Sequence, residues 1–123
     1  MSDAWRTYSN APEEGTLVCP ANEVPARGAR CITVSSSNGD FPLLLVRDGT
    51  GVRGFVNACP HQYLPLNYRS DAVLSADGRR LLCSAHGAAF DSVTGACLSG
   101  EAADGLDPVP LTEDAQGNLR IRR

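Results

Sequence analysis

Glycine and proline divide this chain into short segments, and this punctuation limits the kind of fold that it can adopt. Its 12 glycines and 8 prolines separate short runs that are apolar or that alternate between apolar and polar residues. Runs of this length between turn residues are typical of β-strands. The runs are Cys31 to Val34, Leu43 to Arg47, Val52 to Asn57, Arg80 to Cys83, Ala88 to Phe90, Val109 to Leu111 and Leu119 to Ile121.

The segments between these runs contain residues that favour reversal of the chain. They include Ser37-Asn38-Gly39-Asp40, Arg47-Asp48-Gly49, Ala76-Asp77-Gly78 and Gln116-Gly117-Asn118. Helical periodicity is weak, and only Pro12 to Gly15 and Asn22 to Ala26 are expected to form about one turn of helix. We therefore expect an all-β fold with antiparallel strands.

Length and charge restrict the classes of protein further. The 123 residues suit one compact domain over residues 1–123, and we find no repeat or linker. The net charge is −3, which gives no basic patch for nucleic acid. Five of the 14 acidic residues fall between Glu101 and Asp114, which indicates either a solvated surface or a face that steers a basic protein partner.

No segment has the features of a membrane span or an export signal. The longest apolar run, Phe41 to Val46, is interrupted by Pro42 and is far shorter than the roughly 20 apolar residues that cross a bilayer. Residues Met1 to Asn10 are polar and lack both a basic start and an apolar run of signal-peptide length. We expect a soluble, cytoplasmic protein with no membrane partner.

The chemistry-bearing residues are concentrated in two short segments, Cys59-Pro60-His61 and Cys83-Ser84-Ala85-His86. They hold both histidines and two of the five cysteines of the chain, and 21 residues separate them. An odd number of cysteines cannot all pair internally, and the cytoplasm keeps thiols reduced. A thiolate and an imidazole one or two residues apart can point at one metal centre, so two such loops supply four ligands.

Two kinds of metal centre fit this ligand set. A structural zinc ion would take all four ligands, whereas a Rieske cluster takes two sulfurs on one iron and two nitrogens on the other. Zinc modules usually pair like ligands within one loop, and here each loop carries a mixed pair. The mixed pairs favour the cluster, because each loop then gives one ligand to each iron.

Taken together, these segments resemble the Rieske family. The resemblance lies in C-x-H followed by C-x-x-H at this distance, and it runs from about Val18 to the end of the chain. The flanking residues agree too, namely Asn57-Ala58, Pro65-Leu66, Gly87, Phe90-Asp91, Thr94-Gly95 and Leu98-Ser99-Gly100. Three places depart from the usual pattern: Gln62-Tyr63-Leu64, Ala102 and the stretch from Leu106 to Leu111.

The resemblance implies a Rieske-type antiparallel β-sandwich with a small cluster-binding subdomain of two loops, at about residues 57–100. It implies one [2Fe-2S] cluster held by Cys59, His61, Cys83 and His86 as metal ligands. Rieske proteins that oxidise quinols carry a disulfide between the two loops and two hydroxyl groups near the cluster. Here Leu64 and Ala85 stand at the disulfide positions, and Ala88 and Phe90 stand at the hydroxyl positions.

The difference from the quinol-oxidising Rieske proteins predicts a low reduction potential and an electron-carrying role. Loss of hydrogen bonds to the cluster favours the oxidised state, so we expect a potential toward the lower end of about −150 to +300 mV. Both histidines are committed to the cluster, so none remains for the mononuclear iron of an oxygenase, and we expect no enzyme activity of the chain alone.

The resemblance therefore implies a ferredoxin of a ring-hydroxylating dioxygenase system. Its partners would be an NAD(P)H-dependent flavoprotein reductase and a terminal oxygenase. One alternative is a permanently bound small Rieske subunit of a larger reductase such as nitrite reductase. A second alternative is a zinc-stabilised interaction module without redox activity.

The other residues of interest have simpler explanations. Cys19, Cys31 and Cys97 are expected to be small apolar residues of the core, because free cysteine buries well. Core packing is also the expectation for Trp5. Tyr63 and Leu64, just after His61, are expected either to shield the cluster or to contact a partner.

Overall fold

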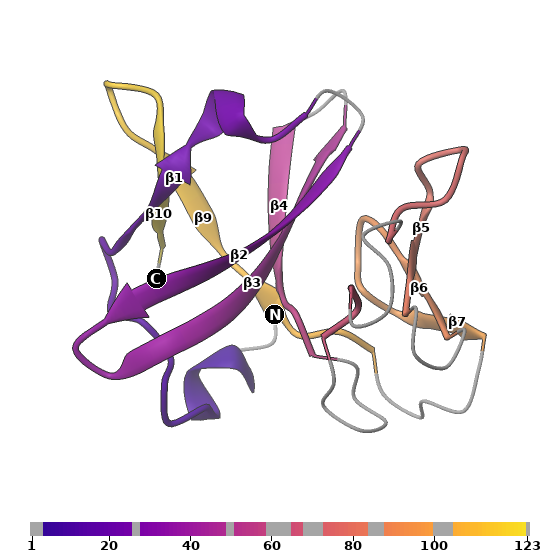
Figure 1. The fold of residues 1–123 in the computed structure, drawn as a ribbon, viewed down its shortest axis with the longest axis horizontal. Coiled ribbons are helices and arrows are strands. Elements are labelled where there is room, and N and C mark those ends of the chain that lie inside the picture. Colours follow the sequence, from indigo (N-terminus) through magenta and orange to yellow (C-terminus); the bar gives the residue numbers. More distant parts are fainter. Residues whose placement is uncertain are drawn as a thin grey trace. The chain divides into compact units, whose positions relative to one another are not determined.

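The computed structural model describes residues 4–25, 28–48, 51–58, 65–67, 73–83, 88–99 and 105–122. The chain divides into two compact units, Met1–Val56 with Asp107–Arg123, and Asn57–Leu106. Every strand pair of the described residues is antiparallel, and the two helices among them are single 3-10 turns. The predicted all-β antiparallel class is thus confirmed (Figure 1).

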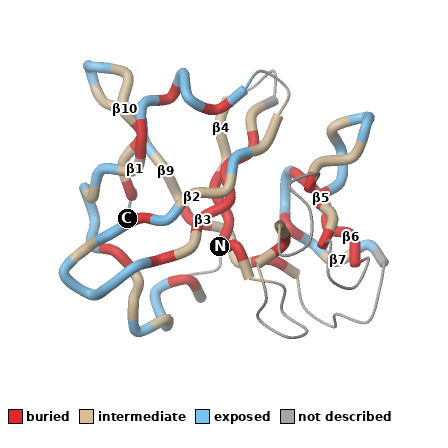
Figure 2. Tube along the Cα trace, in the orientation of Figure 1, coloured by how far each residue is buried: buried red, intermediate tan, exposed pale blue. Residues whose placement is uncertain are grey.

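A four-stranded sheet forms the larger part of the first unit. Its order is β2-β3-β4-β8. The strands are β2 (Ala29–Ser36), β3 (Gly39–Asp48), β4 (Gly51–Val56) and β8 (Pro108–Val109). The buried apolar residues of β3 are Phe41, Leu43, Leu44, Leu45 and Val46. Neighbouring residues of a strand point to opposite faces of the sheet, so β3 is covered on both faces. Figure 2 shows the buried stretch along β3 and β4.

Proline is tolerated inside the central strand β3 because of the register. The amide of Arg47 donates to the carbonyl of Gly28 at 2.9 Å, which sets the alternation of hydrogen-bonded pairs along β2 and β3. By that alternation, the pair Thr33↔Pro42 is a non-hydrogen-bonded one. The pairing of β3 with β4 ends at Leu43↔Val56, so no ladder bond requires an N–H at Pro42.

A second sheet of the first unit has the order β1-β10-β9. Its strands are β1 (Leu17–Pro20), β9 (Leu111–Glu113) and β10 (Asn118–Ile121). The single strand expected over Val109 to Leu111 was wrong, because β8 and β9 belong to different sheets. Pro110 lies between them, and its missing N–H prevents a continuous ladder at the change of sheet.

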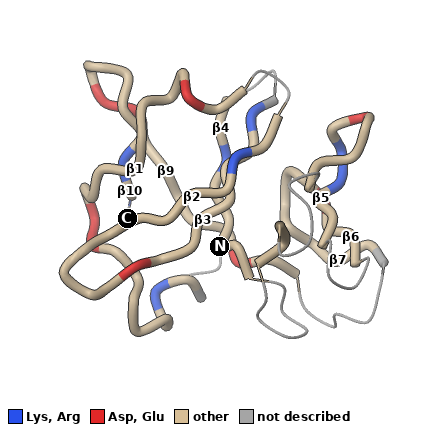
Figure 3. Tube along the Cα trace, viewed as in Figure 1, with Lys and Arg blue, Asp and Glu red and all other residues tan. Residues whose placement is uncertain are grey.

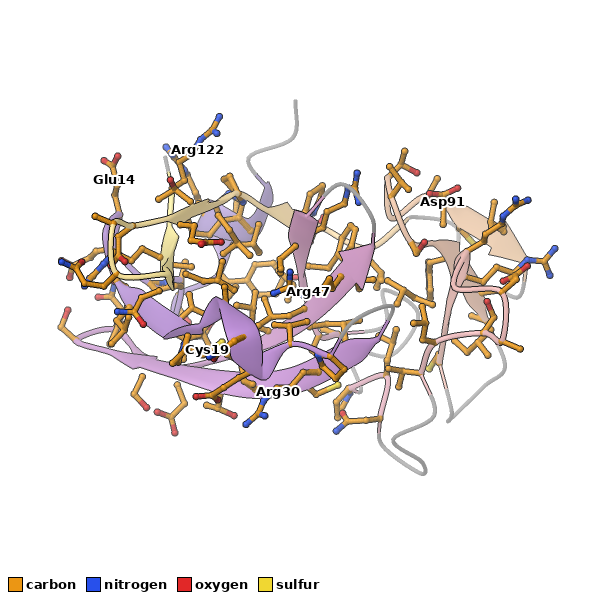
Figure 4. All side chains as sticks on the ribbon, turned by 90° about the horizontal axis from the view of Figure 1, so that it is seen from above. Glu14, Cys19, Arg30, Arg47, Asp91 and Arg122 are labelled. Atoms are coloured by element: carbon orange, nitrogen blue, oxygen red, sulfur yellow. The ribbon has the colours of Figure 1, made fainter. Side chains whose placement is uncertain are left out.

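The amino-terminal part of the first unit packs against the four-stranded sheet. The 3-10 turns are η1 (Ala4–Thr7) and η2 (Ala21–Glu23), the second close to the turn expected at 22–26. Trp5 is only 2% exposed, which confirms its expected place in the core. The Arg47 guanidinium donates to the carbonyl of Val24 at 3.0 Å and to that of Ala21, and so holds η2 against β3 (Figure 4).

The second unit contains a three-stranded sheet with the order β5-β6-β7. Its strands are β5 (Arg80–Leu82), β6 (Ala89–Asp91) and β7 (Cys97–Ser99). Its buried apolar residues, among those described, are Leu66, Val73, Leu81, Cys83, Ala88, Ala89, Phe90 and Leu106. Among the described residues, no helix has the length and apolar character needed to cross a membrane.

Candidate metal centre

The first predicted ligand loop, residues 59–64, lies between two described ends that Asn57 joins. This asparagine follows directly after β4, and its side chain is buried. The main-chain N–H of Leu66 donates to Asn57 Oδ1 at 2.8 Å. Asn57 Nδ2 donates to Asn67 Oδ1 at 3.1 Å. One side chain therefore fixes the distance between the two ends of the loop.

The second predicted ligand loop begins at Cys83 and is closed by the main chain. Strands β5 and β6 pair up to Leu82↔Ala89. Beyond that pair, the N–H of Cys83 donates to the carbonyl of Ala88 at 2.9 Å. A hairpin thus sets the base of the segment 84–87, and the cysteine stands at its first corner.

A turn after β6 holds the segment by which the chain leaves the second unit. Asp91 Oδ1 accepts hydrogen bonds from the N–H groups of Val93 at 2.7 Å and Thr94 at 2.9 Å, which order this turn (Figure 4). The N–H of Leu106 donates to the carbonyl of Gly95 at 2.7 Å. A Cβ on Gly105 would overlap that carbonyl oxygen, so only glycine permits this close approach.

Of the four predicted ligands, Cys83 is described, and Cys59, His61 and His86 lie outside the described residues. The Cys83 side chain is 1% exposed and is a free thiol. A buried cysteine at the end of a strand pair can supply its sulfur to a metal ion. The position suits a metal ligand, and the four-residue ligand set stays a prediction.

The two positions at which quinol-oxidising relatives carry hydroxyl groups are apolar and enclosed. Ala88 and Phe90 are both buried, and neither side chain has a hydrogen-bond donor. The departures expected at Gln62-Tyr63-Leu64, Ala85 and Ala102 lie outside the described residues. The sequence-based reason for a low reduction potential therefore rests on Ala88 and Phe90 within the described part.

Of the charged residues described in the second unit, Asp77, Arg79 and Arg80 lie at the turn before β5 and at the start of that strand, and Asp91 pairs with Arg80 from β6 (Figure 3). Arg79 and Arg80 are exposed, and Asp77 lies at the tip of the turn. Hydrogen bonds from Ser75 Oγ and from the N–H of Arg79 hold the pKa of Asp77 below its usual value. These contacts order the turn that precedes β5, the strand that ends next to Cys83.

Part of the expected acidic segment serves the fold of the first unit. Asp114 Oδ2 accepts from Arg120 Nε at 2.8 Å, and Asp114 Oδ1 accepts from the N–H groups of Gln116 and Asn118. The Arg120 hydrogen bond, followed by the one from Asn118, holds the pKa of Asp114 below its usual value. Glu101 and Asp104 lie outside the described residues, so a docking role for this segment stays a prediction.

The remaining cysteines differ in burial. Cys19 is buried, as expected, and desolvation followed by the nearby Glu23 raises the pKa of its thiol, against a smaller opposing effect of Arg30 (Figure 4). Cys31 and Cys97 are only partly buried, so their expected place in the core was wrong. They lie on β2 and β7, which are edge strands, where one side of the strand has no neighbouring strand in the described sheet.

Asn57 is the residue of this centre whose role the sequence did not reveal. In the sequence it is the last residue of the expected strand Val52 to Asn57 and part of the flank of Cys59. Two signals were available: a polar residue at the end of an apolar strand, and a second asparagine, Asn67, ten residues further along. The cross-loop contact of Asn57 depends on the tertiary path of the chain, which those signals do not give.

Comparison with known proteins gives one family and a set of similar folds. The family model of the Rieske [2Fe-2S] domain matches residues 14–110. Among curated proteins, no match reaches significance.

Three solved structures illustrate the similarity in fold. The ferredoxin of carbazole 1,9a-dioxygenase from Nocardioides aromaticivorans IC177 has a TM-score of 0.70 at 18% identity, covering 89% of this chain and 98% of that one. A complex of reduced oxygenase and oxidised ferredoxin in carbazole 1,9a-dioxygenase gives 0.66 at 22%, covering 86% and 90%. A putative NADH-dependent nitrite reductase small subunit from Mycobacterium tuberculosis gives 0.64 at 21%, covering 88% and 93%. At these identities, the likeness establishes the fold.

Proposed function

Because the chain belongs to the Rieske [2Fe-2S] domain family, we propose that it is a carrier of single electrons whose cluster is held by Cys59, His61, Cys83 and His86. The observation that carries the proposal is the family match over residues 14–110, which includes both ligand segments. The match favours iron over the zinc-stabilised module, because the matched domain is defined by its [2Fe-2S] cluster. When bound, such a cluster accepts and returns one electron.

The residues of the chain have separate parts in this proposal. Cys59 and Cys83 would supply thiolates to one iron, and His61 and His86 would supply neutral imidazoles to the other. Asn57 and the β5–β6 hairpin hold the bases of the two ligand loops. The buried side chains of Ala88 and Phe90 have no hydrogen-bond donor, which supports a potential toward the lower end of about −150 to +300 mV.

We propose that the electrons come from an NAD(P)H-dependent flavoprotein reductase and go to a ring-hydroxylating terminal oxygenase. Support comes from the similarity in fold to a dioxygenase ferredoxin, nearly all of whose chain is covered, and to a ferredoxin in complex with its oxygenase. The chain has two histidines, both in the proposed ligand set, which supports a carrier without an oxygen-activating iron. The proposed setting is the cytoplasm, where thiols such as Cys31 and Cys97 stay reduced.

A second candidate is a small subunit bound permanently to a larger reductase. The similarity in fold to a putative nitrite reductase small subunit supports it. The two candidates differ in the lifetime of the complex, because a ferredoxin must dissociate from one partner to reach the next. Size-exclusion chromatography after expression with the neighbouring genes separates them, since a permanent subunit elutes with a large chain.

Electron paramagnetic resonance of the dithionite-reduced protein tests the proposal, with iron and zinc assayed on the same sample. We expect two irons per chain and the rhombic signal of a cluster with mixed nitrogen and sulfur ligands. A silent spectrum with one zinc per chain would refute the electron-carrying role.

A further inference from the structure

The two ligand loops of the second unit are closed in different ways. A strand pair and the hydrogen bond from Cys83 to Ala88 hold the two ends of the second loop together. Among the described residues, no strand pair joins the two ends of the first loop. There the connection is made by the side chain of Asn57.

Asn57 is well placed to hold the two described ends of the first loop together. Its side chain is 5% exposed, and Leu66, whose N–H it accepts, is 0% exposed, so water cannot readily replace that bond. The Leu66 N–H to Asn57 Oδ1 distance of 2.8 Å and the Asn57 Nδ2 to Asn67 Oδ1 distance of 3.1 Å are those of good hydrogen bonds. Both polar ends of the Asn57 amide are therefore engaged across the loop.

We propose that Asn57 is a positioning residue for the cluster, which sets the geometry of the loop that carries Cys59 and His61. This inference rests on the proposed function, because it assumes that these two residues are ligands. The Asn57 amide fixes the loop on both sides of them, at 57 and at 66–67. Each of the two ligands serves a different iron, so a loose first loop would disturb both irons at once.

Three variants and one control isolate this effect. N57A removes both hydrogen bonds and leaves the buried N–H of Leu66 without its acceptor. N67A removes the acceptor of the Asn57 Nδ2 contact and keeps the contact of Asn57 with Leu66. N57D keeps an acceptor for Leu66, and the Asn67 amide, turned over, can donate to the other carboxylate oxygen.

The control is N38A, in the first unit. The Asn38 side chain also donates to a segment distant in the sequence, to the carbonyl of Ala11 at 2.9 Å, but it lies in the exposed β2–β3 hairpin. The variant thus loses an asparagine contact of the same kind without touching the second unit. It reports what the loss of such a contact does to general stability.

Two readouts are used on each holoprotein. The first is the rate at which a ferrous chelator removes iron after reduction with dithionite. The second is the width of the rhombic resonance, which reports disorder among the iron ligands. A defect in folding alone would lower the yield of protein without broadening the resonance of the molecules that hold a cluster.

We expect N57A to lose iron about tenfold faster than wild type, since both hydrogen bonds of a buried amide are lost, and to show a broader resonance. Tenfold corresponds to about 1.4 kcal/mol. We expect N67A to lose iron about threefold faster, N57D to lie closer to wild type than N57A, and N38A to match wild type.

Rates and line widths of N57A and N67A equal to those of N38A would overturn the positioning role while leaving the carrier role intact. If N57A does not fold, N67A alone decides, because it keeps the buried Leu66 N–H satisfied. Failure of the proposed function is seen separately, as a wild-type protein without iron or without the rhombic signal.

Discussion

Substituting Gly105 by alanine tests the close packing that ends the second unit. The Cβ would overlap the carbonyl oxygen of Gly95 and lie 3.0 Å from Ala96 Cα, and both of these are main-chain atoms. The main chain must therefore move, which also weakens the 2.7 Å hydrogen bond from Leu106 to Gly95. Overpacking costs about 1–3 kcal/mol and the lost bond about 1 kcal/mol, so we expect a total of about 2–4 kcal/mol.

The matched control for this substitution is G54A. A Cβ on Gly54 would meet the end of the flexible Leu111 side chain at 3.0 Å and the carbonyl oxygen of Val109 at 3.1 Å, so smaller movements relieve it. We expect a loss of about 1 kcal/mol or less for G54A, at the lower end for overpacked sites. Neither glycine has a positive φ, so the comparison isolates steric overlap.

Guanidinium chloride unfolding, followed by far-ultraviolet circular dichroism and by the visible absorption of the cluster, measures both variants. We expect G105A to lower the midpoint more than G54A and to lose visible absorption first, because the overlap lies within the second unit. A G105A midpoint equal to or above that of G54A would refute the steric reasoning.

Three further predictions concern single side chains. H86A should abolish the rhombic resonance, and an unchanged spectrum would remove His86 from the ligand set. D114N should lower the stability at neutral pH, because it removes the acceptor of Arg120. The pKa of Asp114 is lowered in the folded protein, so its contribution is present above about the usual value of 3.8 and is lost as the pH falls through the folded pKa. F90Y should raise the reduction potential by about 40 mV, if the new hydroxyl favours the reduced cluster by about 1 kcal/mol.

Each of these has its own check. Stability of D114N is compared with wild type in chemical unfolding at several pH values, and a difference that persists far below pH 3.8 would contradict the assignment. The reduction potential of F90Y is measured by redox titration. The control is F41Y in the first unit, where Phe41 is likewise fully buried. An equal shift in both variants would exclude a direct effect on the cluster.

The strands that the sequence predicted are those with their own apolar pattern. Strands β3 and β4 were foreseen because their runs are buried and bounded by glycine or by turn residues. Strand β1 was missed, because only Cys19 of its four residues is buried and the strand exists through its pairing with β10. Strand β7 was missed for a similar reason: Leu98 is exposed, and pairing with β6 defines the strand.

The predicted metal centre likewise has features that the local sequence reveals and features that depend on tertiary contacts. Residue types and spacing were sufficient to propose the four ligands and the family, because both histidines of the chain lie one or two residues after a cysteine. The supports of the loops could not be read in that way. The contacts of Asn57 with Leu66 and of Gly105 with Gly95 join residues that come together only when the chain is folded.

The place where the chain leaves and rejoins the first unit has a consequence for how this architecture can vary. Val56 donates its N–H to the carbonyl of Asp107 at 2.9 Å, and Phe55 pairs with Pro108, so the exit and the return are neighbours on one ladder. Strands β4 and β8 pair as in a hairpin, and the second unit, Asn57–Leu106, is inserted as the loop between them. The entropic cost of closing such a connection rises only with the logarithm of its length. The inserted unit can therefore gain or lose residues, and with them new contact surfaces, while the sheet that carries it keeps the same register.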